Sequence, residues 1–303
     1  MRLDGIHHIS CITGDARVNL DFYTRVLGMR LVAKTVNQDD PTVYHLFYGD
    51  YAGSPGFDLT FFEYPGARPG RASAGMVYRI AFRVASPEAI DFWDTRLSTE
   101  DVTTAREDGE LRFRDPEGLE LALVIDTSGD APLHPRHPDI PTEFELLGFD
   151  HVVAYGGRLE NSARVLTEVM GGRSTGDSTW EVRGPTRGGW IRFDQPPEER
   201  GIGGGGTVHH VAWATDPEEH DGWVERLHRG GVSSTPVIDR HYFRSIYFRE
   251  PSGVLYELAT KGPGFTVDDP LESLGARLIL PPRFESRRAE ISERLTPLPD
   301  MSR

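Results

Sequence analysis

The sequence predicts an α+β fold in which four copies of one β-α-β-β-β unit form two cupped sheets. Strand-like segments recur four times, and a helix-like stretch follows each of them. Two of the copies also end in closely matching turn-and-strand sequences. Internal repeats indicate architecture strongly, because every copy must bury the same face. The repeat explains the sequence better than a parallel α/β fold does.

The first strand of each unit is rich in β-branched and aromatic residues, and its apolar residues alternate or run continuously, as they do in strands. The four segments are 5–13 (GIHHISCIT), 76–85 (MVYRIAFRVA), 148–157 (GFDHVVAYGG) and 207–215 (TVHHVAWAT). The first and the fourth are near copies, and both contain a histidine pair.

A helix is expected after each first strand. Residues 15–28 place apolar side chains at four-residue spacing, which makes one face. Residues 86–97 begin with Ser-Pro, a favourable N-cap and first helical residue. Residues 160–172 and 216–231 end in Gly-Gly, where helices commonly stop.

Short closing strands complete each unit, most clearly in 112–124 (RFRDPEGLELALV) and 247–259 (YFREPSGVLYELA). A proline-rich stretch between the second and third units indicates a linker. The predicted organisation is units one and two in 1–126, the linker in 127–147, units three and four in 148–261, and a wrapping tail with a short helix in 262–303.

Charge and composition restrict the partners. The chain has 303 residues with a net charge of −14 and no basic cluster, so nucleic acid and anionic membranes are poor partners. A single cysteine fits a reducing compartment. No apolar run approaches a membrane span of about 20 residues, and no signal-peptide stretch is evident. We expect a cytoplasmic protein, for which a homo-oligomer is compatible with the sequence.

Neighbouring side chains on a strand point to opposite faces, so only one histidine of each pair can face the concave side of a sheet. Alignment of the four first strands gives one column for the concave side and an apolar column for the core. The concave column holds His8, Arg79, His151 and His210. His7 and His209 are expected to point away from it, although the start of a strand could let them curl round.

Glu257 stands in an otherwise apolar strand, where a carboxylate is costly unless it is paired or bound to a metal. The matching residue is Ala122 in the second unit and, by a looser alignment, Arg192 in the third. In the first unit, laying Asp-Leu-Thr over Glu-Leu-Ala gives Asp58.

His8, His210 and Glu257 thus form a two-histidine, one-carboxylate set. This set leaves coordination positions open and suits non-haem iron(II) chemistry with O₂, although manganese(II) accepts the same ligands. If both histidines bind one metal, units one and four must share a cavity, and units two and three form a metal-free pair. Whether Asp58 or His151 also contacts the metal stays open here.

Two long motifs resemble the vicinal oxygen chelate superfamily of glyoxalases, bleomycin resistance proteins and extradiol dioxygenases. They are GIHHIS…DFYTRVLGMRLVAKTVNQDDPTVYHLFYGDYAGSPGFDLTFF and DRHYFRSIYFREPSGVLYELATKGPGF. Within the superfamily they are similar to the ring-cleaving dioxygenases related to hydroquinone and chlorohydroquinone dioxygenases. The likeness covers essentially the whole chain, including the LPPRFESRRAEI tail.

The resemblance implies an iron(II) enzyme that opens a small aromatic diol with O₂, with the metal held by His8, His210 and Glu257. It also implies further catalytic-site residues, which are His7, Ser10, His209, Arg240 and Tyr247. Chemically, Arg240 can stabilise a phenolate, Tyr247 can donate a hydrogen bond, and His209 can carry a proton near neutral pH. Relatives often carry threonine at position 10, where serine keeps the hydroxyl group.

Three functions therefore compete. A ring-cleaving dioxygenase, with hydroquinone-type substrates favoured over catechols, is the preferred interpretation. A glyoxalase-like isomerase or lyase would add Asp58 as a fourth ligand. An aromatic- or drug-binding protein of the same fold would not need an intact ligand set.

Overall fold

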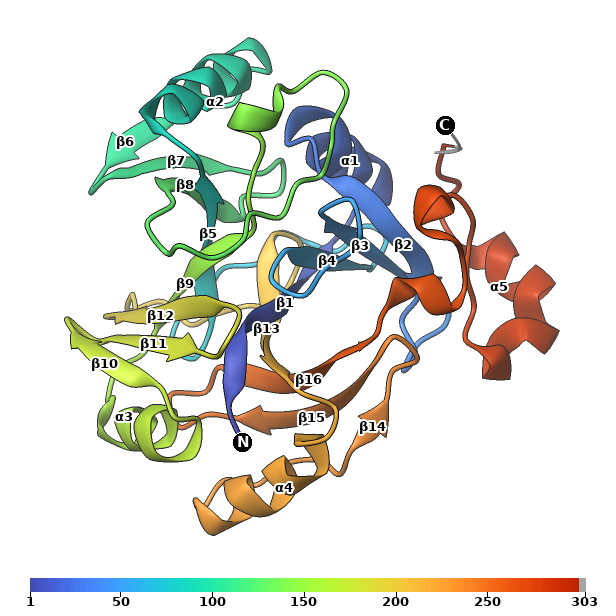
Figure 1. Ribbon diagram of the computed structural model, residues 1–303. Helices are drawn as coiled ribbons and strands as arrows, with labels where there is room; N and C mark the ends of the chain where they lie inside the picture. The colour runs from blue at the N-terminus through green and yellow to red at the C-terminus, as the bar shows by residue number, and fades with distance from the viewer. Residues whose placement is uncertain (300–303) are drawn as a thin grey trace.

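The computed structural model describes residues 1–299, and its strands form two eight-stranded mixed sheets (Figure 1). The first sheet contains β1 (Leu3–Thr13), β2 (Arg30–Val36), β3 (Tyr44–Gly49), β4 (Asp58–Glu63), β13 (Thr207–Thr215), β14 (Ile238–Asp239), β15 (Phe243–Arg249) and β16 (Leu255–Pro263). The second contains β5 (Val77–Val84), β6 (Ala105–Glu107), β7 (Glu110–Arg114), β8 (Glu120–Ile125), β9 (Phe149–Tyr155), β10 (Arg173–Gly176), β11 (Thr179–Arg183) and β12 (Gly188–Asp194). The predicted α+β fold is confirmed. Units one and four share the first sheet, and units two and three share the second, as the shared-metal hypothesis required.

Each unit carries its helix where the sequence predicted one. The helices are α1 (Ala16–Asp21), α2 (Pro87–Thr99), α3 (Glu160–Arg164) and α4 (His220–Arg229), and α1 and α3 continue as π-helical turns over 22–26 and 165–169. Asp15 caps α1 by accepting from the backbone N–H groups of Arg17 and Val18, and Ser86 caps α2. The tail ends in α5 (Arg288–Arg294), at the margin of the first sheet (Figure 1). In residues 1–299 no helix has the length and apolarity needed to cross a membrane.

Strand pairing at the centre of the first sheet positions the functional side chains. β1 and β13 are antiparallel, and Ile9 lies opposite Val211, so that His8 pairs with Ala212 and Ser10 with His210. This register places an approximate two-fold axis between Ile9 and Val211. The predicted core column agrees with it, since Ile9, Ile80, Val152 and Val211 are all 0% exposed.

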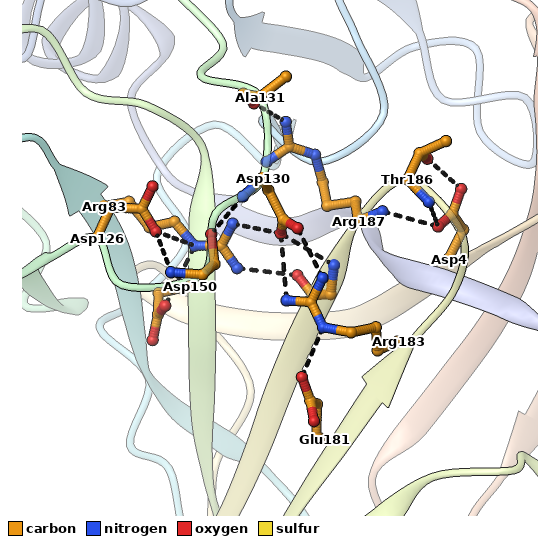
Figure 2. A network of polar contacts seen from close by, with 12 residues as sticks. Asp4, Arg83, Asp126, Asp130, Ala131, Asp150, Glu181, Arg183, Thr186 and Arg187 are labelled. Atoms are coloured by element: carbon orange, nitrogen blue, oxygen red, sulfur yellow. Dashed lines mark hydrogen bonds and ion pairs between the residues drawn. The ribbon is translucent and has the colours of Figure 1, made fainter.

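A buried ion-pair network connects the segment between units two and three to the second sheet (Figure 2). Arg83 on β5 is 1% exposed and lies 2.8 Å from Asp130 and 3.1 Å from Asp150. Asp130 also pairs with Arg183 at 2.6 Å. Burial alone would raise the pKa of Asp130, but hydrogen bonds from Arg183, the Gly188 N–H and Arg83 lower it to about 2. The predicted linker is therefore held against the second sheet by the ion pairs of Asp130.

Removal of the Arg83 charge should destabilise the protein strongly. In Arg83→Gln the carboxylates of Asp130 and Asp150 lose a buried partner, a change that typically costs about 3–5 kcal/mol. Arg25→Gln is the matched control, because Arg25 pairs with Asp21 and Glu100 while 52% exposed, and should cost less than about 1 kcal/mol. Urea unfolding measures both, and equal losses would contradict a stabilising role of the buried network.

Candidate metal centre

Three side chains from units one and four converge in the first sheet. His8 and His210 are 1% and 4% exposed, and Glu257 on β16 is fully buried. The Oε2 atom of Glu257 lies 3.2 Å from Nε2 of His8 and 2.8 Å from Nε2 of His210. The two Nε2 atoms are 3.3 Å apart. Within residues 1–299 these three side chains are the group whose ligand atoms lie close enough together to hold one ion.

Two β-bulges explain why both members of each histidine pair lie at this centre. The register skips His7 on β1, between the pairs Ile6–Trp213 and His8–Ala212, and it skips His209 on β13 in the same way. A bulged residue is released from strict alternation. Each contacts its neighbour, with Nδ1–Nδ1 distances of 3.0 Å to His8 and 2.8 Å to His210. The expectation that His209 points away is wrong, because His209 lines the cavity beside the centre, whereas His7 lies behind His8.

The hydrogen bonds of His7 define the tautomer of His8. Nε2 of His7 lies 3.0 Å from the carbonyl oxygen of Thr260, which can only accept, so this nitrogen carries the hydrogen. Burial and the neighbouring His8 lower the pKa of His7 to about 3, so its ring is neutral and Nδ1 accepts. His8 can then donate from Nδ1, which leaves its Nε2 facing the centre.

The donor set fits a divalent metal ion. Oε2 of Glu257 is buried and accepts no hydrogen bond within residues 1–299. Burial opposes ionisation of Glu257, but the adjacent His8 and His210 imidazoles hold the pKa of its carboxyl well below the usual range. Neighbouring ligands around an octahedral ion with bonds of about 2.1 Å lie about 3.0 Å apart, which matches the observed separations. A cation between these atoms would satisfy lone pairs that otherwise face one another.

A hydroxyl group, rather than a second carboxylate, occupies the corner opposite Glu257. Ser10 and Ala212 are equivalent positions, each one residue after the axis residues Ile9 and Val211. Ala212 pairs with Glu257 on β16, and Ser10 pairs with Thr60 on β4. The counterpart of Glu257 is therefore Thr60, and the alignment that gave Asp58 was wrong by two residues. Asp58 lies outside the convergent group, and burial raises the pKa of its carboxyl well above the usual range. For units two and three, the register confirms Ala122 and Arg192 as counterparts.

A cavity of about 350 Å³ opens onto the convergent residues. Its wall contains aromatic side chains, including those of Phe62, Tyr242 and Phe243. Arg240 reaches the cavity with Nε 3.3 Å from the Tyr247 hydroxyl oxygen, and its other nitrogens lie 3.0 and 3.1 Å from Asp39. Ser10, His209, Arg240 and Tyr247 all line this cavity, whereas His7 lies behind His8.

His151 belongs to the second sheet and has a structural environment. It lies 2.7 Å from Asp150 and 3.2 Å from Glu110, and Glu110 also pairs with Arg79 at 3.0 Å. Burial opposes protonation of His151, but its hydrogen bonds with Asp150 and Glu110 raise its pKa above the ordinary value. Where the first sheet has candidate metal ligands, the second has ion pairs.

Sequence reasoning missed His45, Thr60 and Ser245. His45 on β3 lines the cavity, and its Nε2 lies 2.9 Å from Oγ1 of Thr60. Ser245 on β15 donates a hydrogen bond to Oε1 of Glu257. A count of strand register across the repeat, rather than along one motif, would have located all three.

Comparison with known proteins agrees with this geometry. The model of the Glyoxalase/Bleomycin resistance protein/Dioxygenase superfamily matches residues 5–123 and 148–258. MhqA of Bacillus subtilis, provisionally named a ring-cleaving dioxygenase, is 41% identical over 98% of this chain and 100% of its own length. The chlorohydroquinone/hydroquinone 1,2-dioxygenase of Sphingobium indicum is 30% identical over 96% of this chain and 95% of its own length.

Two solved structures are also similar to this chain. The crystal structure of a Bacillus subtilis protein, provisionally named a dioxygenase, has a TM-score of 0.90 at 36% identity and covers 98% of both chains. Glyoxalase I from Zea mays shares the fold, with a TM-score of 0.59 at 16% identity over 85% of this chain and 92% of its own. Paired β-α-β-β-β units in two mixed sheets are the vicinal oxygen chelate fold. The chain belongs to the Glyoxalase/Bleomycin resistance protein/Dioxygenase superfamily and, by its close relatives, to the ring-cleaving dioxygenase branch.

The ligand assignment predicts different outcomes for two buried acids. Glu257→Gln removes the anionic ligand and should lower the bound metal from about one ion per chain to a small fraction of that. Asp58→Asn is the matched control, because Asp58 lies outside the group and burial raises the pKa of its carboxyl, so metal content should be unchanged. Metal analysis after anaerobic loading and desalting measures both. Loss of metal in Asp58→Asn would support a four-ligand site instead.

His151 should make the stability of the second sheet depend on pH. Its pKa is raised above 6.5 on folding, so its contribution is complete below about pH 6.5 and is lost as pH rises through the folded pKa. The stability difference between the wild type and His151→Gln should therefore be larger at pH 6 than at pH 9. His228→Gln on the exposed side of α4 is the control. Denaturant unfolding at both pH values tests this, and a difference that grows with pH would contradict it.

Proposed function

We propose that the protein is an iron(II)-dependent ring-cleaving dioxygenase that inserts O₂ into a small aromatic diol, with hydroquinone-type rings favoured over catechols. The observation that carries the proposal is the two-histidine, one-carboxylate group with an uncharged hydroxyl at its fourth corner. Such a set leaves several metal positions open for small ligands. The name of the Sphingobium indicum relative supports the hydroquinone preference.

Bound iron would supply electron transfer between the ring and O₂, and the chain's own residues would prepare both reactants. Phe62, Tyr242 and Phe243 give the cavity aromatic surface against which a ring can stack. Arg240 is cationic and stabilises a phenolate oxygen. Burial raises the pKa of Tyr247, so its hydroxyl remains protonated and can donate a hydrogen bond.

Histidines beside the ligands hold them in place. Although His209 is an exposed residue, partial desolvation and the neighbouring His210 lower the pKa of its ring, and its Nδ1 can accept from His210. In this proposal, His7 and His209 orient the ligands, and a proton-carrying role for His209 is not needed. Groups of this kind commonly change metal affinity or activity by 10–100-fold when they are removed.

The glyoxalase-like alternative lacks a supporting observation, because its fourth ligand, Asp58, lies outside the convergent group. The intact three-residue group also favours an enzyme over a metal-free binding protein of this fold. The proposal places the enzyme in the cytoplasm, where the buried thiol of Cys11 would stay reduced.

Oxygen consumption tests the proposal. Protein loaded anaerobically with iron(II) is given hydroquinone, methylhydroquinone, chlorohydroquinone or catechol, and O₂ uptake and ring opening are followed together. One O₂ should be consumed for each ring opened, fastest with a para-diol, and His210→Ala should lower the rate by about 100-fold or more. Arg25→Gln, at an exposed ion pair, is the control with unchanged rate. Absence of uptake with every diol despite stoichiometric iron would overturn the proposal.

A further inference from the structure

The approximate two-fold symmetry of the first sheet fails at one pair of positions. About the axis between Ile9 and Val211, His8 corresponds to His210. The strand registers extend the correspondence to three further pairs, Thr60 with Glu257, Phe47 with Tyr247 and His45 with Ser245. His8 and His210 are identical residues at equivalent positions. The residues beside them differ in size and charge, because Thr60 corresponds to Glu257 and His45 corresponds to Ser245.

Both halves nevertheless keep the same hydrogen bond. On the fourth-unit side, the short Ser245 donates to Oε1 of the long Glu257, which leaves Oε2 for the centre. On the first-unit side, the long His45 reaches the short Thr60, with Nε2 2.9 Å from Oγ1. Oγ of Ser10 lies 2.8 Å from the same Thr60 oxygen. A large and a small side chain have exchanged places across the axis.

We propose that His45 and Thr60 form a specificity-determining pair that keeps the metal without a fourth protein ligand. Together they fill the space that a second Glu–Ser pair would occupy, and they turn a neutral imidazole edge towards the cavity. The proposal deepens the proposed function, because it concerns the same centre and states what prevents a glyoxalase-like ligand set from forming.

The environment of His45 supports this role. Its ring packs against Phe47 and Phe62, with centroid distances of 4.0 and 4.2 Å, so two neighbouring rings constrain its orientation. Burial and the nearby His8 and His210 lower the pKa of His45 well below its ordinary value, which keeps the ring neutral. Glu257 is then the single anionic ligand. A divalent ion keeps one net positive charge, which favours an anionic oxygen of the substrate, whereas two glutamates would cancel that charge.

The symmetrising variant Thr60→Glu/His45→Ser tests the proposal. It copies the Glu257–Ser245 pair into the first unit, where the smaller Ser makes room for the longer Glu. The double variant should still bind one divalent ion per chain and hold it about tenfold more tightly or better, because a second carboxylate is added. Its ring-cleavage rate should fall by about 100-fold or more. Equilibrium dialysis against a metal-buffering chelator gives the affinity independently of activity, and circular dichroism verifies the fold.

A second pair of variants distinguishes the hydrogen bond between Thr60 and His45 from the shape of the Thr60 side chain. Thr60→Val removes the hydroxyl that orients His45 and should lower kcat/KM for the diol by about tenfold or more, while metal affinity changes by less than about threefold. Thr60→Ser retains the hydroxyl and should restore the activity. An equal loss in both variants would show that the hydroxyl does not position His45.

Metal affinity also separates this inference from the proposed function. If the wild type binds metal but opens no ring, the dioxygenase proposal fails, and tighter binding by the double variant still supports the role of His45 and Thr60. If the double variant folds and shows neither tighter metal binding nor reduced ring cleavage, position 60 does not face the metal and the inference is overturned.

Discussion

The pairing of β1 with β13 is the constraint on which the rest of the site depends. Its register places His8 and His210 on either side of one axis, and its two bulges, at His7 and His209, bring the neighbouring rings to the same centre. The flanking strands β4 and β16 are fixed by the same register, so that Glu257 and Thr60 stand at opposite corners. A slip of either strand by one residue would turn its side chains to the opposite face, so its histidine would leave the centre. The pairing of β1 with β13 thus determines which side chains reach the site, how they are oriented and that Thr60, rather than a second carboxylate, lies opposite Glu257.

The two sheets show how one repeated unit supports different chemistry. In the first sheet, buried histidines surround a carboxylate and leave a cavity of about 350 Å³ beside it. In the second, Arg79 and His151 occupy the corresponding column, and Glu110 and Asp150 neutralise them. Buried charges are tolerated only when they are paired or bound to an ion. Ion pairs satisfy this condition within the second sheet, and a metal ion would satisfy it within the first.

Much of the fold and the convergence of the candidate ligands could be predicted because the repeat imposes a common pattern. The apolar column through Ile9 and Val211 and the convergence of His8 with His210 and Glu257 followed from aligned strands. The errors arose where local geometry departs from an ideal strand. A bulge reversed the expected direction of His209, and the counterpart of Glu257 was assigned along one motif instead of across the strand pairs. Long-range pairs such as Arg83 with Asp130 have no local pattern in the sequence.

The central claim is that units one and four hold one metal ion through three side chains and leave Thr60 unligated. Anomalous diffraction at the iron edge from crystals of the iron-loaded protein tests this most directly. We expect one peak for each chain, within bonding distance of His8, His210 and Glu257, with the Thr60 hydroxyl still bonded to His45. A peak bonded to Asp58, or one in the second sheet beside His151, would contradict it.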